Sequence, residues 1–333
     1  MSAADAFSYR LIATDAGANS ATSSVAGLTI AASPAADSYA AMVVANNPLA
    51  YYRLNETSGT NVYDYVGDHN GTYEVNAIVG VAGPTNAPFA GFESGNLCLE
   101  TSSGGLTSWA DAPFGTLAGM SNVTFTCWIY PIGVQSDYAG LIVDRTGAGG
   151  GGGLGYGGSG NQMLAYNWNT NTADTFISGL VIPSGQWSFC ALVIAPDGST
   201  LYLYNTSGLD ATNNPIPHLP GVFGNAWHLG NDISANDPSR TFNGKIDEVA
   251  IFGSSLSTDQ ISRLYVTATS GLPRGISIAP SGHNLVLTWF QGVLLQAPAL
   301  TGPWTTNSAA NSPYSVPPTG TQQFYKLLIP ILP

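Results

Sequence analysis

Charged residues are scarce in this chain. Asp, Glu, Lys and Arg make up only 8% of its 333 residues, and only two lysines occur, Lys245 and Lys326. The formal net charge is −12 at pH 7. No basic stripe is therefore available to displace counterions from phosphates, which excludes nucleic-acid binding. Attraction to anionic membranes is disfavoured for the same reason, and no apolar run approaches the roughly 18 residues of a membrane span. We therefore predict no membrane insertion.

Cysteine is rarer still, with three residues: Cys98, Cys127 and Cys190. Each lies in an apolar, strand-like pattern, where a free thiol behaves as a small buried hydrophobe. Because the number is odd, at least one thiol stays unpaired. We predict that all three are buried and reduced, with a Cys127–Cys190 bridge as the alternative. The sequence also lacks His-x-His and His-x-x-x-His metal spacings and a nucleophile elbow between a strand and a helix.

Glycine, in contrast, is abundant, with 40 residues. Many glycines and few charges are typical of a turn-rich, all-β protein rather than a helical one. A chain of 333 residues suits one large sandwich with small flanking modules.

The segment Gly244–Phe252 is rich in β-branched residues and follows a turn, so it is predicted to be a strand. A helix start follows closely. Ser257 and Gln260 have the spacing of a capping box, in which each side chain bonds the backbone N–H of the other residue. Ile261 and Leu264 give this helix an apolar side.

Further segments upstream have the same strand-like character and occur in a fixed order. They are Tyr51–Gly59 with Asp64 and Asn70–Tyr73, then Val123–Pro131, then Gly185–Val193 with Leu201–Asn205. Together with the closing strand and capped helix, they resemble a laminin-G-like (concanavalin A-like) jelly roll over about residues 40–270. The resemblance implies an all-β fold, an antiparallel β-sandwich. Function does not follow from it, because this fold carries lectins, adhesins, glycosidases and inert spacers.

The flanking segments divide the chain further. Residues 1–32 resemble the C-terminal hairpin of an immunoglobulin-like domain, and 33–48 are predicted to be a linker with a short helix. Residues 49–271 would form the jelly roll, and 272–333 a small C-terminal β module. No signal peptide precedes the hairpin. We expect a fragment of a longer, exported bacterial polypeptide, located outside the cell or at its surface, with neighbouring domains as partners.

Residues 147–160 are mostly glycine. A phosphate-binding loop would need a following Lys-Ser/Thr and a helix, and both are missing. The segment is therefore predicted to be a flexible or close-packed hairpin, or a mobile loop beside a ligand cleft.

The resemblance also implies a structural Ca²⁺ site. Its candidate ligands are Asp64 and Asp247, with Glu56 and Asn70, because Ca²⁺ prefers hard oxygen donors. In the alternative, Asp64 and Asn70 bond their own turn, and Asp247 or Glu248 pairs with Arg53.

Three aromatic residues are candidates for stacking on sugar rings: Tyr156, Tyr166 and Trp168. Tyr166 and Trp168 would share one face of a strand, flanked by Asn and Thr. The alternative is that they pack in the core.

A catalytic pair is less well supported. Related glycosidases carry Glu-x-Asp-x-x-Glu on one strand, and this motif is missing. Asp137 and Asp144, with Arg145 beside them, are the candidates for a two-carboxylate cleft. The alternative is an Asp144–Arg145 ion pair.

Three hypotheses result. The first is a calcium-stabilised extracellular module that binds a polysaccharide or the glycan of a glycoprotein. The second is a glycoside hydrolase or lyase that acts in the groove of the sandwich. The third is a structural spacer without a ligand of its own.

Overall fold

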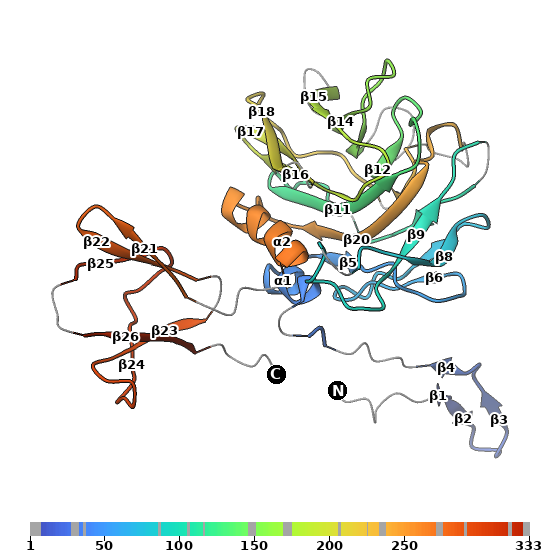
Figure 1. The fold of residues 1–333 in the computed structure, drawn as a ribbon. Helices are drawn as coiled ribbons and strands as arrows, with labels where there is room; N and C mark the ends of the chain where they lie inside the picture. Colours follow the sequence, from blue (N-terminus) through green and yellow to red (C-terminus); the bar gives the residue numbers. More distant parts are fainter. Residues whose placement is uncertain are drawn as a thin grey trace. The chain divides into compact units, whose positions relative to one another are not determined.

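The computed structural model describes residues 8–27, 33–35, 38–85, 88–104, 107–115, 117–145, 151–168, 175–205, 208–224, 226–232, 238–270, 276–289, 292–318 and 322–328. The chain divides into two compact units, residues 1–35 and 36–333. Most of the second unit is a sandwich of two antiparallel sheets (Figure 1).

The first sheet is the one that the helices do not cover, and it carries the candidate site. In spatial order its strands are β15 (Thr175–Val181), β14 (Met163–Trp168), β13 (Gly152–Tyr156), β12 (Gly140–Asp144), β19 (Trp227–Leu229), β10 (Ala110–Asp111), β7 (Gly71–Tyr73) and β6 (Asn61–Val62).

The second sheet holds the longest strands. In order they are β18 (Gly208–Asn214), β17 (Gly198–Asn205), β16 (Ser188–Ala195), β11 (Val123–Pro131), β20 (Gly244–Phe252), β9 (Leu97–Thr101) and β8 (Ile78–Ala82), and β5 (Ala50–Tyr52) also pairs with β20. The predicted strand at Gly244–Phe252 is therefore confirmed as β20.

The side chains of β11 show how the two sheets form a core. Phe125, Cys127 and Ile129 point between the sheets, into the main apolar cluster. Trp128 points to the opposite side, where a second cluster lies under the helices. Because successive residues of a strand face opposite sides, nearly every residue of β11 is buried on one side or the other.

Two helices cover the outer face of the second sheet. Helix α1 (Tyr39–Ala45) starts at Ser38, whose side chain accepts the backbone N–H of Ala41. Helix α2 (Thr258–Ser270) starts with the predicted capping box: Gln260 N–H donates to Ser257 Oγ at 3.3 Å, and Ser257 N–H donates to Gln260 Oε1 at 2.9 Å. Both helices bury one side against the sheet, with Tyr39, Val43, Ile261 and Leu264.

The glycine-rich segment contains a strand rather than only a hairpin loop. Strand β13 pairs with β12 on one side and β14 on the other, and all five of its residues are buried. A Cβ on Gly153 would lie 2.0 Å from the carbonyl oxygen of Ile142, so only glycine fits that position. Residues 146–150 lie outside the described residues.

The flanking segments form small sheets. In the first unit, β1 (Ser8–Tyr9) pairs with β4 (Ala26–Gly27), and β2 (Ile12–Thr14) pairs with β3 (Ser20–Thr22). The C-terminal part has two three-stranded sheets. One consists of β21 (Ser277–Ser281), β22 (Asn284–Thr288) and β25 (Tyr314–Val316). The other consists of β24 (Thr305–Thr306), β23 (Val293–Ala297) and β26 (Phe324–Leu328). A 3₁₀ turn, η2, covers Pro238–Arg240. The likeness of residues 1–32 to an immunoglobulin-like hairpin stays a prediction.

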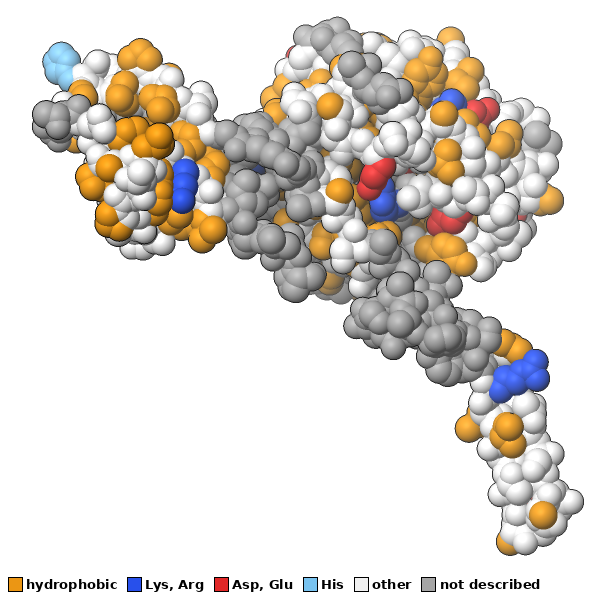
Figure 2. All heavy atoms as spheres, turned by 60° about the horizontal axis from the view of Figure 1, so that its bottom comes forward, with side chains coloured by type: hydrophobic (Ala, Val, Ile, Leu, Met, Phe, Trp, Pro, Cys, Tyr) orange, Lys and Arg blue, Asp and Glu red, His pale blue; other side chains and the backbone are white. Residues whose placement is uncertain are grey.

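The low charge of the sequence is visible on the surface. Figure 2 shows one face of the molecule, on which the charged side chains are few and scattered among polar and hydrophobic ones. Among the described helices, none has the length and apolar character needed to cross a membrane.

Candidate functional site

The candidate site lies where the short strands β7, β10 and β19 meet. Asp111 of β10 lies opposite Thr72 of β7 on one side and His228 of β19 on the other. Ala110 and Leu229, the residues next to this pair in the strands, point into the core. Because strand side chains alternate, Asp111 and His228 point away from the core, onto the outer face of the sheet.

Asp111 and His228 form a hydrogen-bonded pair. Nδ1 of His228 lies 2.8 Å from Oδ1 of Asp111. The side chain of His228 is 15% exposed and that of Asp111 is 40% exposed. An ionised carboxylate only accepts hydrogen bonds, so Nδ1 carries the proton and donates it. In neutral His228 the other ring nitrogen, Nε2, is then an acceptor. The carboxylate thus fixes which nitrogen of His228 a ligand can meet.

Two further side chains hold Asp111 in place. Trp109 Nε1–H donates to Asp111 Oδ1 at 3.1 Å, and its ring meets the imidazole of His228 edge-on at 6.0 Å. Glu74 lies beside the same carboxylate. Burial, the charge of Asp111 and a hydrogen bond with it raise the pKa of Glu74 above its usual value.

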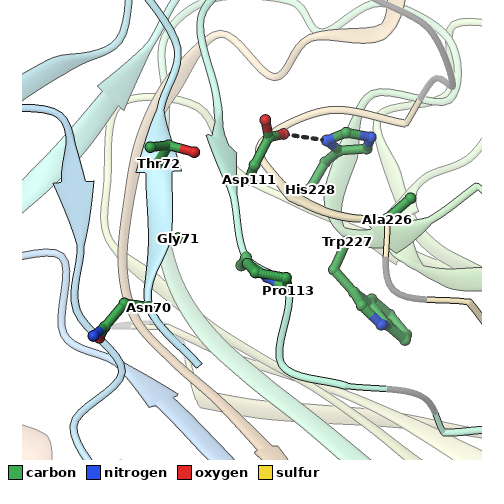
Figure 3. Close-up of a pocket in the computed structure, with 9 residues that line it drawn as sticks. Asn70, Gly71, Thr72, Asp111, Pro113, Ala226, Trp227 and His228 are labelled. Carbon is green, nitrogen blue, oxygen red and sulfur yellow. Dashed lines mark hydrogen bonds and ion pairs between the residues drawn. The ribbon is translucent and has the colours of Figure 1, made fainter. Parts of the chain in front are cut away.

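A hollow of about 350 Å³ opens beside this pair. Its polar lining consists of Asp111, His228, Thr72 and Asn70, and Pro113, Ala112, Ala226, Trp227 and Gly71 complete it. Figure 3 shows Thr72 and His228 on either side of Asp111. The side-chain oxygen Oδ1 of Asn70 accepts the backbone N–H of Asp64 at 2.9 Å, so the side-chain NH₂ group is what Asn70 offers to a ligand. The hollow therefore combines acceptors with neutral donors.

The three predicted stacking residues lie in the core instead. Tyr156, Tyr166 and Trp168 are 3%, 1% and 0% exposed, and all belong to the main apolar cluster. Tyr166 and Trp168 do share one face of β14, as predicted, but that face points inward. Trp168 packs against Phe223 at 4.9 Å. The core alternative therefore replaces the predicted stacking surface.

The predicted carboxylates of a catalytic cleft do not face one another as a pair. Asp144 is fully buried, and its Oδ2 accepts the backbone N–H of Gly224 at 2.7 Å. Asp137 is exposed and accepts Gly160 N–H at 2.6 Å. Arg145 forms an ion pair with Asp232 at 2.5 Å.

Three of the four predicted calcium ligands are occupied by protein hydrogen bonds. Asp64 accepts the backbone N–H groups of Tyr51, Val66 and His69, and also contacts His69 Nδ1 at 3.1 Å. Glu56 accepts Tyr63 N–H and the Tyr73 hydroxyl. The oxygen of Asn70 is bonded to Asp64, as described above. These hydrogen bonds agree with the turn alternative for Asp64 and Asn70.

Asp247, the fourth candidate, has a different environment. It is fully buried, its Oδ2 accepts Asn96 Nδ2–H at 2.6 Å, and its Oδ1 has no hydrogen-bond partner. The oxygen of Asn96 is buried and equally without a donor. Two orphaned hard oxygens are suitable ligands for Ca²⁺. Among the residues that the structure describes, however, no group of three His, Cys, Asp or Glu side chains is placed to hold a metal.

Glu248, beside Asp247, is paired within the protein. Arg53 donates to Glu248 Oε1 at 3.2 Å and to Glu93 at 2.6 Å, and the Tyr51 hydroxyl donates to Glu248 Oε2. Glu248 has φ 52° at an irregularity where β20 shifts register against β11. The bulge lets two consecutive carboxylates reach separate buried partners. Burial raises the pKa values of both Asp247 and Glu248.

The hollow is better suited to binding than to glycoside hydrolysis. Glu74 and Asp111 are hydrogen-bonded to each other, whereas hydrolysis by two carboxylates needs them about 5 Å apart or more. The same lining gives donors and acceptors for sugar hydroxyls, which can do both.

The sequence analysis did not single out Asp111, His228, Glu74 or Thr72. Asp111 and His228 are 117 positions apart, and β10 and β19 are only two and three residues long. Strands this short have no periodicity that could reveal their pairing.

Comparison with known proteins agrees with this fold. Residues 103–262 match the model of the concanavalin A-like lectin/glucanases superfamily. The sandwich therefore has a concanavalin A-like fold, and the predicted resemblance is confirmed over the matched residues. No curated protein matches the sequence.

Several solved structures are similar to part of this chain, each with a TM-score below 0.5. One is domain 4 of AbnA, a GH43 extracellular arabinanase from Geobacillus stearothermophilus, in complex with arabinotriose: 20% identity, TM-score 0.46, covering 65% of this chain and 97% of that one. Another is Trypanosoma rangeli sialidase in complex with 2,3-difluorosialic acid, with 14% identity and a TM-score of 0.47; the match covers 66% of this chain and 32% of that one. A third is the binding domain of botulinum neurotoxin serotype G, with 12% identity and a TM-score of 0.46; the match covers 76% of this chain and 68% of that one.

Proposed function

We propose that this chain is a carbohydrate-binding or adhesion domain that holds a neutral glycan in the Asp111–His228 hollow. The observation that carries the proposal is the fixed tautomer of His228, which presents Nε2 as an acceptor next to the carboxylate of Asp111 and the exposed residue Thr72. A sugar with neighbouring hydroxyl groups can donate to the first two and accept from the third. A strongly anionic ligand would be repelled by a chain of net charge −12.

The domain is proposed to act outside the cell, as one module of a larger secreted or surface protein. The expected tandem of flanking β modules supports this location. The proposed ligand is a polysaccharide or the glycan of a glycoprotein.

Ca²⁺ is proposed to stabilise the domain, with Asp247 and Asn96 as its protein ligands. Bound there, it would supply positive charge to two buried oxygens that have no donor. Burial without such a charge is costly for Asp247: burial and the charge of Glu93 raise its pKa, whereas Asn96, Arg53 and a backbone hydrogen bond with Glu248 lower it only in part.

Affinity electrophoresis tests the proposed function. The intact chain is run through gels that contain β-glucan, mannan, xylan, arabinan or no polysaccharide. Retardation by one polysaccharide is expected, and His228→Ala should abolish it. His283→Ala is the matched control, because His283 lies in the C-terminal part, away from the hollow. If no polysaccharide retards the chain, the spacer hypothesis replaces this one.

A further inference from the structure

A second hollow lies on the other side of the sandwich and differs in character. It has a volume of about 320 Å³ and is lined by four aromatic residues, Phe89, Trp128, Trp187 and Tyr265. Asn205 and Thr269 provide polar groups at the same hollow. An aromatic lining with a few polar groups is the usual composition of a small-ligand site.

The aromatic rings are held by contacts that do not need a ligand. Trp128 is fully buried, stacks on Tyr265 at 5.9 Å and 17°, and meets Phe89 nearly at a right angle at 5.5 Å. The Tyr265 hydroxyl donates to the carbonyl oxygen of Asn205 at 2.8 Å. Phe89, Trp187 and Tyr265 are half-buried, so part of each ring is exposed at the surface while the rest packs against its neighbours. A pre-organised aromatic surface loses little freedom when a ligand binds.

The chemistry of this hollow favours the apolar face of a sugar ring. Aromatic faces attract both cations and the C–H face of a sugar. A cation is disfavoured here because Lys245 already lies over Tyr130 at 5.8 Å, and Tyr130 contacts Trp187 at 5.7 Å. Thr269 follows Tyr265 by four residues on α2, so its hydroxyl lies on the same side of the helix. That hydroxyl donates to the carbonyl oxygen of Tyr265 at 3.1 Å, so it offers a lone pair that can accept from a sugar hydroxyl.

The two hollows face opposite directions. Trp128 and Tyr265 belong to the cluster between the helices and the outer face of the β11–β20 sheet. Asp111 and His228 lie on the outer face of the other sheet. We propose that the aromatic hollow is a second glycan site, which stacks a pyranose ring, so that one chain binds two glycan segments on opposite faces. This inference rests on the proposed function and extends it to cross-linking of polysaccharide.

Calorimetric titration of the intact chain tests the inference. The probes are hexasaccharides of β-1,4-glucose, β-1,4-mannose, β-1,4-xylose and α-1,5-arabinose. The wild type should bind two molecules of one probe per chain, and Trp187→Ala and His228→Ala should each bind one. Tyr63→Ala is the matched aromatic control, because Tyr63 is 45% exposed and belongs to neither hollow.

A gentler variant keeps the test valid if Trp187→Ala does not fold. Thr269→Val preserves side-chain shape and should weaken the second site about tenfold, with the first site unchanged. One bound molecule in the wild type, abolished by His228→Ala and unaffected by Thr269→Val, would overturn this inference and leave the proposed function standing. No binding of any probe would overturn both.

Discussion

The hydroxyl of Tyr166 donates a hydrogen bond to Nε2 of His218 across 2.7 Å. This direction follows from its other two partners, Ser199 Oγ at 2.8 Å and Asn214 Nδ2 at 2.7 Å, both of which donate to the hydroxyl. A hydroxyl has one proton and two lone pairs, so its remaining bond must be donated. Tyr166 therefore joins β14 to β17 and β18 from inside the domain, rather than presenting its ring to a ligand.

Tyr166→Phe removes that hydroxyl without a large change in shape. Three buried polar groups would each lose a partner, so the free energy of unfolding should fall by about 1–3 kcal/mol. Urea unfolding followed by tryptophan fluorescence measures it. Tyr63→Phe, on an exposed ring, should change stability little. Equal effects of the two substitutions would contradict the role given to Tyr166.

Protonation of His218 should destabilise the fold. Burial lowers the pKa of His218 below its usual value, so the unfolded chain binds a proton more readily than the folded one. The stability that neutral, buried His218 contributes is complete above about pH 6.5, the pKa of histidine in the unfolded chain. It is lost as the pH falls from there through the lower pKa of the folded state. Asp247 and Glu248 act in the opposite direction, because their pKa values are raised in the folded state.

Urea unfolding between pH 7.5 and 5 isolates this contribution. The slope of stability against pH should be smaller in His218→Gln than in the wild type. His283→Gln, on an exposed histidine of the C-terminal part, should keep the wild-type slope. An unchanged slope in His218→Gln would show that His218 is not the group responsible.

Calcium should raise the stability of the chain through Asp247. At about 100 times its Kd, Ca²⁺ should add about 2.7 kcal/mol to the free energy of unfolding, and Asp247→Asn should abolish that gain. Asp64→Asn should destabilise the turn and keep the response to calcium, because the carboxylate of Asp64 is already bonded to backbone N–H groups. Thermal unfolding with calcium and with chelator measures both. Loss of the response only in Asp64→Asn would reverse the assignment.

The thiols should be inert in the folded chain. Cys127 and Cys190 lie opposite each other on β11 and β16, yet both are free, and Cys98 is free and buried as well. Burial raises the pKa values of all three thiols, which keeps them protonated and unreactive. A disulfide-exchange reagent should label all three only in denaturant. Fast labelling of the native chain, or a mass two hydrogens lower than expected, would contradict this.

Gly153→Ala should disrupt the pairing of β12 and β13. The new Cβ would lie 2.0 Å from the Ile142 carbonyl oxygen, at φ 151°. Both effects should lower the free energy of unfolding by roughly 3 kcal/mol or more. Gly95→Ala is the control, because nothing lies within 4 Å of a Cβ there. Similar stability of the two variants would mean that β13 can shift to make room.

Local signals in the sequence explain which parts of the fold were predictable. Ser257 and Gln260 determine the start of α2 through contacts between residues only three positions apart. Strand β20 contains enough β-branched residues to be predicted from its own sequence. Strand β13 was missed because glycine has low strand propensity, and its role depends on neighbouring carbonyl groups far away in the sequence.

The candidate site was harder to predict than the fold. The spacing of Tyr166 and Trp168 does place them on one face of a strand, but only the surrounding sheets decide which face is buried. Asp247 was predicted as a calcium ligand, and that stays a prediction; its hydrogen-bond partner Asn96 is 151 residues away in the sequence and was not identified. Contacts over such distances depend on the sheet order, which spacing does not encode.

We expect Nε2 of His228 to accept a hydrogen bond from a hydroxyl of the bound sugar. Two-dimensional ¹⁵N–¹H NMR of the imidazoles measures this directly, because the chain has only four histidines. During titration with the hexasaccharide that binds, the Nε2 signal of His228 should move and saturate with the same Kd as binding, while the signals of His218 and His283 stay in place. Saturable binding that leaves the His228 signals unmoved would contradict the account.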